Sequence, residues 1–404
     1  MASWSGVLFL VLVAWVVYAS IVVYRTSMVV VLAWAHDDFL HKHHTSVATW
    51  SASCINAFVV LCLNFAYDRV ALWLTKLEWQ RTQKDFDRSL NMKASIFRSL
   101  NSYSSIFYVA FAKMAFFYRS PNNYGRIFGF RLEECSAGGC HMELVKMVSV
   151  LFAAKQIKDT LLPFIGEYMA KVLKKRWKKR RSLYKKMIEV DPNRKEYLKY
   201  TIQFGFITLF ASVFPLAPLL ALFNNIVDLR LTARRFLTCY QRPVPQKVQN
   251  IGVWFSMMET LTKVAVVVNA VVIGFTSEFI PKLVFQHYYN NAQGLSGFTN
   301  FSLSTFDLQD LDSESKKSIP AEELADCKGF CRYADYHTRN DNGVYSFSDT
   351  FFVITCARLL FIISYIVLIS SMLATIRWLI PDIPKKLRWQ MERRESNKLL
   401  LKSI

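Results

Sequence analysis

The sequence is poor in acidic residues and lacks the short motifs on which many enzymes depend. Its 404 residues include 30 Asp and Glu against 50 Lys and Arg, with 13 glycines and 11 prolines. It contains no glycine-rich phosphate loop, no metal-hydrolase motif and no nucleophile elbow. No residue stands out as a catalytic candidate, so we expect that the protein is not an enzyme.

The excess of positive charge does not indicate a nucleic-acid-binding protein. The formal net charge is +20 and 53% of the residues are apolar, but Lys and Arg lie mainly between long apolar runs. Such a distribution is typical of membrane proteins, because their cytosolic loops are enriched in basic residues. We therefore expect membrane phospholipids as partners, and no nucleic acid.

Several apolar runs are long enough to cross a bilayer, which takes about 20 residues in a helix. The fold class that we predict is all-α, a polytopic transmembrane bundle of about eight spans. The first run is too long for a signal peptide and lacks a small-residue cleavage site. The expected spans are residues 5–35, 46–75, 95–118, 142–170, 197–213, 215–232, 252–281 and 349–380.

The densest basic run, KVLKKRWKKRRSLYKK at 171–186, sets the orientation. It contains no acid and must be cytosolic by the positive-inside rule. It is also suited to contact anionic lipid, at about 1 kcal/mol per basic residue near the surface. Its charged side chains belong to Lys174, Lys175, Arg176, Lys178, Lys179, Arg180 and Arg181.

Alternation from this run places 36–45, 119–141 and 282–348 on the outer or lumenal side. The last of these loops is comparatively acidic and holds a glycosylation sequon at Asn300. Disulfides are favoured on that side. The candidates are Cys135, Cys140, Cys327 and Cys331.

Acids and amides interrupt the apolar pattern around residues 196–235. An ionisable group at membrane depth is costly and marks a functional site by default. Glu196 and Lys199 are three residues apart, and Asp228 and Thr232 are four apart, so each pair shares one helix face. Two such faces from adjacent helices could meet around an ion.

A second polar stretch begins at Asn101 and includes Ser105. One interpretation is that these side chains line a hydrated pathway. The other is that they form hydrogen bonds between packed helices, for which Ser and Asn are also used. The chemistry of the residues alone does not separate the two.

Five stretches together resemble the anoctamin family. They are IQFGFITLFASVFPLAPLLALFNNIVDLRL, SYSSIFYVAFAKMAFF, FRLEECSAGGCHMEL, RWLIPDIP and QNIGVWFSMME. The resemblance covers nearly the whole chain in the family's order, and the eight spans correspond to family helices three to ten. The family's cytosolic N-terminal domain and first two helices have no counterpart, so we expect a fragment, a truncated gene model or a short isoform.

The resemblance implies a homodimer that is joined mainly through the last span, 349–380. Anoctamins are calcium-activated chloride channels, or scramblases that pass phospholipids along a membrane-exposed groove. Lys113 falls where the family carries a pore-lining lysine. The plasma membrane is favoured over the endoplasmic reticulum, although the sequon and cysteines require only entry into the secretory pathway.

The chain departs from the family at the calcium site. Lys199 and Thr232 stand where the family has acids, and Glu196 and Asp228 remain. On the preceding span the match is either Asp159 with Pro163 or Thr160 with Phe164, and the family's Glu is missing from both. Calcium prefers six to eight oxygens and is tuned by the number of carboxylates, so we expect weakened calcium control.

One hypothesis is that the Lys199 ammonium pairs with Glu196 or Asp228 and partly replaces the ion. The alternative is a degenerate site in which Lys199 extends to the cytosolic interface. For the whole protein the leading function is transport of phospholipid, chloride or both. The competing function is a non-transporting membrane tether or scaffold that keeps the fold and not the gate.

Overall fold

The computed structural model describes much of the chain, and most of the described residues are helical. These residues are 2–33, 38–112, 126–127, 130–131, 140–163, 165–166, 169, 192–238, 251–289, 294–307, 330–339, 345–380 and 384–402. The predicted all-α membrane bundle is confirmed. Lys113, Cys135, Cys327 and the basic run around 174–181 lie outside the described residues.

Four helices in the described part of the chain are long and apolar enough to cross a membrane. They coincide with four of the expected spans. They lie within α1 (Ala2–Ala33), within α2 (Asp38–Lys76), across α9 (Val253–Val271) with η3 (Val272–Thr276), and in α14 (Asp349–Leu379).

The other four expected spans also contain helices, but these carry more polar residues. They are α3 (Gln83–Phe107) with the π-helical η1 (Tyr108–Ala112), α5 (Cys140–Gln156) with η2 (Ile157–Leu161), α7 (Pro192–Leu209), and α8 (Ala217–Thr238). α3 begins at Gln83 rather than near residue 95. The side chain of Thr82 accepts a hydrogen bond from the backbone N–H of Asp85, which caps the extra turns.

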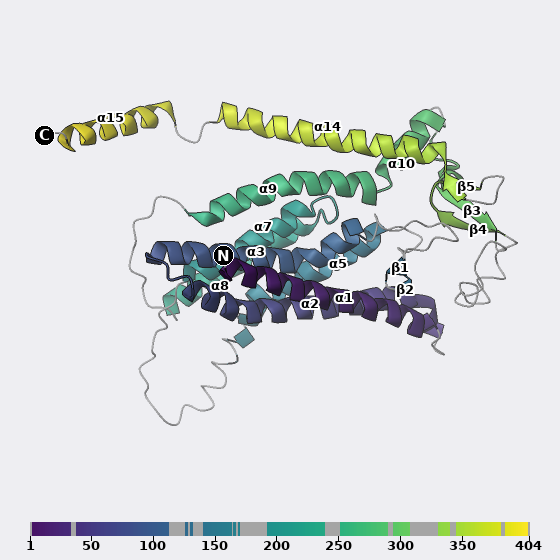
Figure 1. The fold of residues 1–404 in the computed structure, drawn as a ribbon, viewed down its shortest axis with the longest axis horizontal. Helices are drawn as coiled ribbons and strands as arrows, with labels where there is room; N and C mark the ends of the chain where they lie inside the picture. Colours follow the sequence, from purple (N-terminus) through teal and green to yellow (C-terminus); the bar gives the residue numbers. More distant parts are fainter. Residues whose placement is uncertain are drawn as a thin grey trace, which may run out of the picture.

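The helices form a bundle in which α1 packs on α2 and α3, α2 also packs on α5, and α7 lies between α3 and α9 (Figure 1). Its core is aromatic. The Tyr103 ring meets Phe206 edge-on with centroids 5.1 Å apart, and Phe152 meets Phe206 at 6.2 Å. Edge-to-face pairs of this kind are favourable because of the ring quadrupole. They join α3, α5 and α7.

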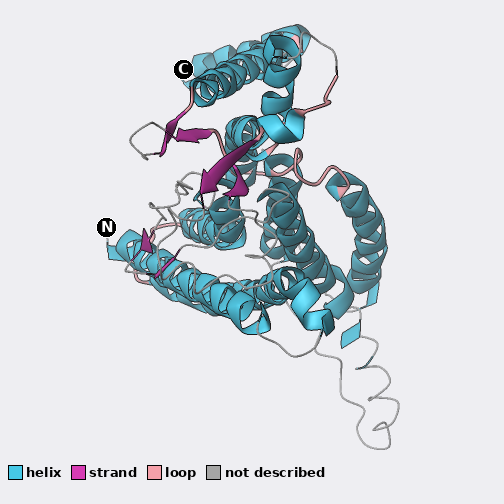
Figure 2. Ribbon diagram, turned by 90° about the vertical axis from the view of Figure 1, so that its right-hand side faces the viewer, coloured by secondary structure: helices cyan, strands magenta, loops and turns pink. Residues whose placement is uncertain are grey.

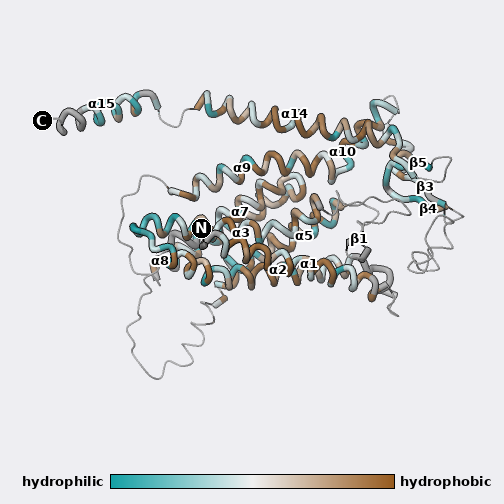
Figure 3. The backbone as a smooth tube through the Cα atoms, viewed as in Figure 1, coloured by the Kyte–Doolittle hydropathy of each residue, from teal (hydrophilic) through white to brown (hydrophobic). Residues whose placement is uncertain are grey.

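α14 lies along the outside of this bundle, against α9 and α10 (Phe279–Val284) (Figures 1 and 2). Ile354 is its buried residue, and most of its large apolar side chains are exposed in the single chain. Figure 3 shows the apolar character running along α14, whereas α15 (Lys385–Lys402) is hydrophilic. Such a helix needs lipid or another protein surface around it.

Short antiparallel strands occur in the loops that were assigned to the outer side. The sequence analysis did not anticipate them, because each strand has only two to five residues. α11 (Phe298–Phe301) and the π-helical η4 (Phe285–Tyr289) lie in the same region. The pairs are β1 (Arg126–Ile127) with β2 (Phe130–Arg131), β3 (Leu303–Asp307) with β4 (Phe330–Ala334), and β5 (His337–Arg339) with β6 (Tyr345–Phe347).

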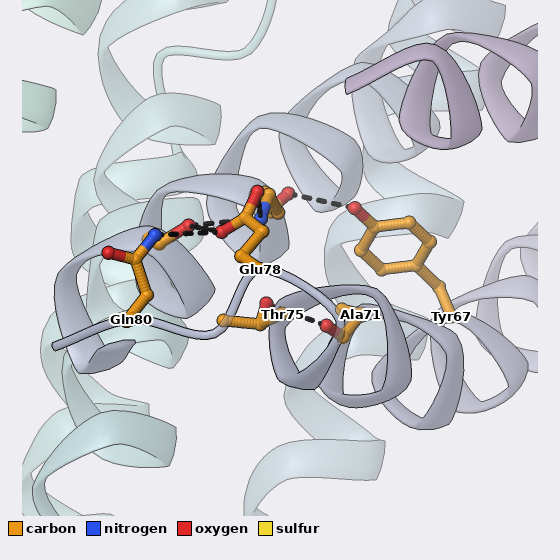
Figure 4. A network of polar contacts seen from close by, with 7 residues as sticks. Tyr67, Ala71, Thr75, Glu78 and Gln80 are labelled. Carbon is orange, nitrogen blue, oxygen red and sulfur yellow. Dashed lines mark hydrogen bonds and ion pairs between the residues drawn. The ribbon is translucent and has the colours of Figure 1, made fainter. Parts of the chain in front are cut away.

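A polar network closes the turn between α2 and α3 (Figure 4). Lys93 is fully buried, and its Nζ lies 2.5 Å from Glu78 Oε1. Ser89 donates to Glu78 Oε2 at 2.7 Å, and the Tyr67 hydroxyl donates to the Lys93 carbonyl at 3.3 Å. A buried charge is tolerable when it is paired and hydrogen-bonded. The network therefore fixes Glu78, which follows α2, against the first turns of α3.

Candidate functional site

Three of the predicted ion-site residues, Glu196, Lys199 and Asp228, come together where α7 packs on α8, and η2 packs on α8 as well. Asp228 of α8 is fully buried. The Nζ atom of Lys199, on α7, lies 2.5 Å from Asp228 Oδ2 and 4.0 Å from Glu196 Oε2. The lysine side chain is 11% exposed, so it is turned into the protein and not extended to an interface. The sequence hypothesis had named this contact as one of two for Lys199.

Asp228 has a second donor on α7. The Tyr200 hydroxyl donates to Asp228 Oδ2 at 2.7 Å, so the oxygen that faces the ammonium also accepts this hydrogen bond. Hydrogen bonds to an ionised group are short and strong. One turn further along, Gln203 Nε2 donates to Asn225 Oδ1 at 3.0 Å. The contact between α7 and α8 is thus made largely by polar groups.

A second lysine reaches the same place from α5. Lys155 Nζ donates to the backbone carbonyl of Lys199 at 3.1 Å and lies 5.9 Å from the centre of the Phe206 ring. Lys155 and Tyr200 were not among the predicted site residues. The available signal was a lysine at membrane depth on a helix already suspected of contributing to the site.

The two hydroxyl-bearing members of the expected site contribute little to binding an ion. Asp159 and Thr160 lie in η2, a π-helical turn of the kind that often occurs at functional sites. The hydroxyls of Thr160 and Thr232 are buried and have no hydrogen-bond partner among the described residues. Hydroxyls carry no charge, so they do not replace the carboxylates of a calcium site.

These residues do not fit a calcium ion. The described residues contain no group of three or more His, Cys, Asp or Glu side chains arranged to hold a metal. The Asp228 carboxylate faces the Lys199 ammonium at 2.5 Å, which is within the usual range of calcium–oxygen distances. A divalent ion there would meet a positive charge in place of a ligand.

The two candidate pathway residues join helices in this structure. Asn101 Nδ2 donates to Asn64 Oδ1 at 2.9 Å, and the Tyr18 hydroxyl donates to Asn101 Oδ1 at 2.7 Å. Asn56 Nδ2 donates to Ser105 Oγ at 2.9 Å. Both are buried, so the helix-bonding interpretation describes them here. Their place along a pathway, like that of Lys113, stays a prediction.

The candidates on the outer side are partly described. Cys140, the first residue of α5, is disulfide-bonded. Pairing with Cys135 stays a prediction, as does the role of Cys331, of which only the backbone in β4 is described. Asn300 is exposed on α11 and its Oδ1 accepts a hydrogen bond from Arg332 Nη1 at 3.1 Å.

Comparison with known proteins agrees with this architecture. The family described as "Anoctamin: Calcium-activated chloride channel" matches residues 1–394. Human Anoctamin-1 is 36% identical over 406 residues, which cover 96% of this chain and 41% of that protein. Bovine Anoctamin-4 is 35% identical over 97% of this chain and 45% of its own length. Mouse Anoctamin-5 is 38% identical over 83% of this chain and 38% of its own length.

The chain thus spans about two fifths of the length of these relatives. The match runs through nearly all of the chain, including the polar junction of η2, α7 and α8. On this evidence, the chain belongs to the anoctamin family.

Proposed function

We propose that this chain forms the membrane pathway of an anoctamin-type transporter, which moves phospholipids between leaflets, conducts chloride, or does both. The observation that carries the proposal is the family match over residues 1–394. The family description names a calcium-activated chloride channel, and the matched region of this chain contains the membrane helices.

The polar interior of the bundle supports transport. A buried ion pair between Arg25 and Glu143 joins α1 to α5. A second ion pair, between Arg98 and Asp68, joins α3 to α2. Ionisable groups inside a membrane bundle are costly and typically line ion or substrate routes. The Asn101 and Ser105 hydrogen bonds hold α1, α2 and α3 together beside these ion pairs.

In this proposal calcium control is weakened, because a lysine faces Asp228 at the junction of η2, α7 and α8. The protein acts as a homodimer through α14, whose apolar surface is exposed in the single chain. The plasma membrane is the favoured location. The basic run around 174–181 contacts anionic lipids of the cytosolic leaflet.

A second candidate is a non-transporting tether or scaffold. The same Lys199–Asp228 ion pair favours it, because a site that has a lysine where the family has a calcium ligand is not needed in a protein without a calcium-gated pathway. The tether would keep the fold and use the basic run to hold an opposing anionic membrane.

The two candidates are separated by reconstituting the chain in liposomes. Exposure of dye-labelled phospholipid to an external quencher and chloride efflux are followed in parallel, with calcium and with a chelator. Transport predicts that at least one signal exceeds that of protein-free liposomes, and weakened calcium control predicts little difference in rate between the two conditions. A chain that gives neither signal contradicts transport and supports the tether.

A charge-reversal pair tests the pathway within the same assay. Lys113→Glu is expected to lower chloride efflux, because the resemblance places this lysine in the pore. Lys386→Glu is the matched control, since it makes the same substitution at an exposed position in α15. Equal efflux in the two variants would remove Lys113 from the pathway.

A further inference from the structure

We infer that Lys199 supplies a tethered positive charge at the junction of η2, α7 and α8. The buried carboxylate of this junction is then neutralised by the protein's own ammonium and not by calcium. The inference rests on the proposed function only for its effect on transport. The charge arrangement itself is a property of the folded chain.

The first step is the position of the ammonium. Lys199 Nζ lies 2.5 Å from one oxygen of Asp228 and 4.0 Å from one oxygen of Glu196. It therefore contacts one carboxylate and lies near a second. A bridging divalent cation would occupy a similar place, because calcium binds carboxylate oxygens at comparable distances.

The second step is burial. Asp228 is fully buried and the Lys199 side chain is 11% exposed, so water does little to stabilise either charge. Removing one partner of a buried ion pair is strongly destabilising, because the other charge remains uncompensated. The carboxylate needs a positive neighbour at all times, and Lys199 provides one whatever the calcium concentration.

The third step is that neighbouring side chains anchor both the Lys199 backbone and the Asp228 carboxylate. The backbone carbonyl of Lys199 accepts a hydrogen bond from Lys155 of α5 at 3.1 Å. Tyr200, the next residue of α7, donates to the same Asp228 oxygen at 2.7 Å. α5, α7 and α8 therefore meet at a single residue. A second cation entering here would be repelled by the Lys199 ammonium.

The experiment measures calcium binding and thermal unfolding of the purified full chain in detergent. Radioactive calcium and a denaturation scan are applied to the wild type and to Lys199→Glu. We expect no binding and no calcium-dependent shift for the wild type. In chelator, Lys199→Glu should unfold several degrees lower than the wild type, because Asp228 loses its counter-charge. Adding calcium should restore stability, because a ligand that binds only the native state stabilises it.

Lys386→Glu is the matched control, because it changes the net charge equally at an exposed site on α15. It should resemble the wild type. Lys199→Arg keeps a positive charge and should remain insensitive to calcium. Should Lys199→Glu fail to fold, the neutral Lys199→Gln is measured instead, with a lowered midpoint and a gain of calcium binding expected.

Calcium binding by the wild type would overturn the inference. So would a Lys199 variant, Glu or Gln, with a wild-type midpoint and no gain of binding. Neither readout involves flux, so a chain that transports nothing in liposomes can still pass or fail this test. Conversely, a chain that transports and also binds calcium would support the proposed function and contradict the inference about Lys199.

Discussion

A single glycine decides how closely two helices of the bundle approach. At Gly205 of α7, a Cβ atom would lie 1.9 Å from the hydroxyl oxygen of Tyr103 on α3. That hydroxyl donates to the Ile202 carbonyl at 2.8 Å. The tyrosine therefore packs directly on the α7 backbone, which is possible because glycine has no side chain.

We predict that Gly205→Ala lowers the free energy of unfolding by about 1–3 kcal/mol, the usual cost of forcing an extra group into a packed core. Gly166→Ala is the matched control, because nothing lies within 4 Å of its added Cβ. Denaturant or thermal unfolding in detergent measures both variants. Equal midpoints for Gly205→Ala and the wild type would show that Tyr103 moves aside at no cost.

The ion-site residues show what a sequence can reveal about single positions. The spacing predicted that Glu196 and Lys199 share one helix face, which could meet the face of Asp228 on an adjacent helix, and the structure brings the three together. Lys155 and Tyr200 could not be assigned in this way. The Lys155 contact depends on how α5 is rotated against α7, and the Tyr200 contact on how α7 is rotated against α8. Spacing along one helix does not report either rotation.

At the scale of elements, the break between α7 and α8 is held by a third helix. α7 ends at Leu209, so its last carbonyls have no partner within the helix. Asn269 of α9 donates to the Thr208 carbonyl at 2.7 Å and accepts from the Ser212 backbone N–H at 3.1 Å. One amide thereby satisfies backbone groups on both sides of the helix end.

Asn269→Leu is predicted to lower the free energy of unfolding, because each buried backbone group left unsatisfied costs about 1–3 kcal/mol. Thr260→Val on the same helix is the control, since its exposed hydroxyl donates to the Ser256 carbonyl of its own helix. Thermal unfolding in detergent compares the two. If Thr260→Val lowered the unfolding midpoint more than Asn269→Leu does, the proposed role of Asn269 at the end of α7 would be contradicted.

Most helices were predictable because long apolar runs can satisfy their backbone in lipid in few other ways. The first turns of α3 were not, because their charged residues are typical of a loop. The Thr82 cap and the Lys93–Glu78 ion pair, which stabilise these turns, are not visible in the sequence. The outer strands escaped detection as well. Strands of two to five residues show too little alternation to be recognised.

At the scale of the whole molecule, the predicted orientation in the membrane leads us to expect a glycan on Asn300. Asn300 is exposed in a loop assigned to the non-cytosolic side. We expect that treating the protein from eukaryotic cells with a glycosidase increases its electrophoretic mobility, and that Asn300→Gln abolishes this change. Ser302→Thr preserves the sequon and should keep the glycan, whereas Ser302→Ala should lose it.

A protein whose mobility is the same before and after glycosidase treatment would contradict this orientation or the accessibility of the sequon. The orientation is predicted from the basic run and the acidic outer loop, because the distribution of charge along the whole chain can be seen in the sequence. The packing of α14 along the outside of the bundle could not be read in this way, because its apolar residues surround the helix on all sides.

The ion pair between Lys199 and Asp228 also bears on how the chain enters the membrane during synthesis. A lysine or an aspartate within a transmembrane helix opposes its insertion by up to about 2.5–3.5 kcal/mol. α7 carries the lysine, α8 carries the aspartate, and the turn between the helices spans residues 210–216. We therefore expect the two helices to leave the translocon together as a hairpin, each bringing the counter-charge that the other needs to enter lipid.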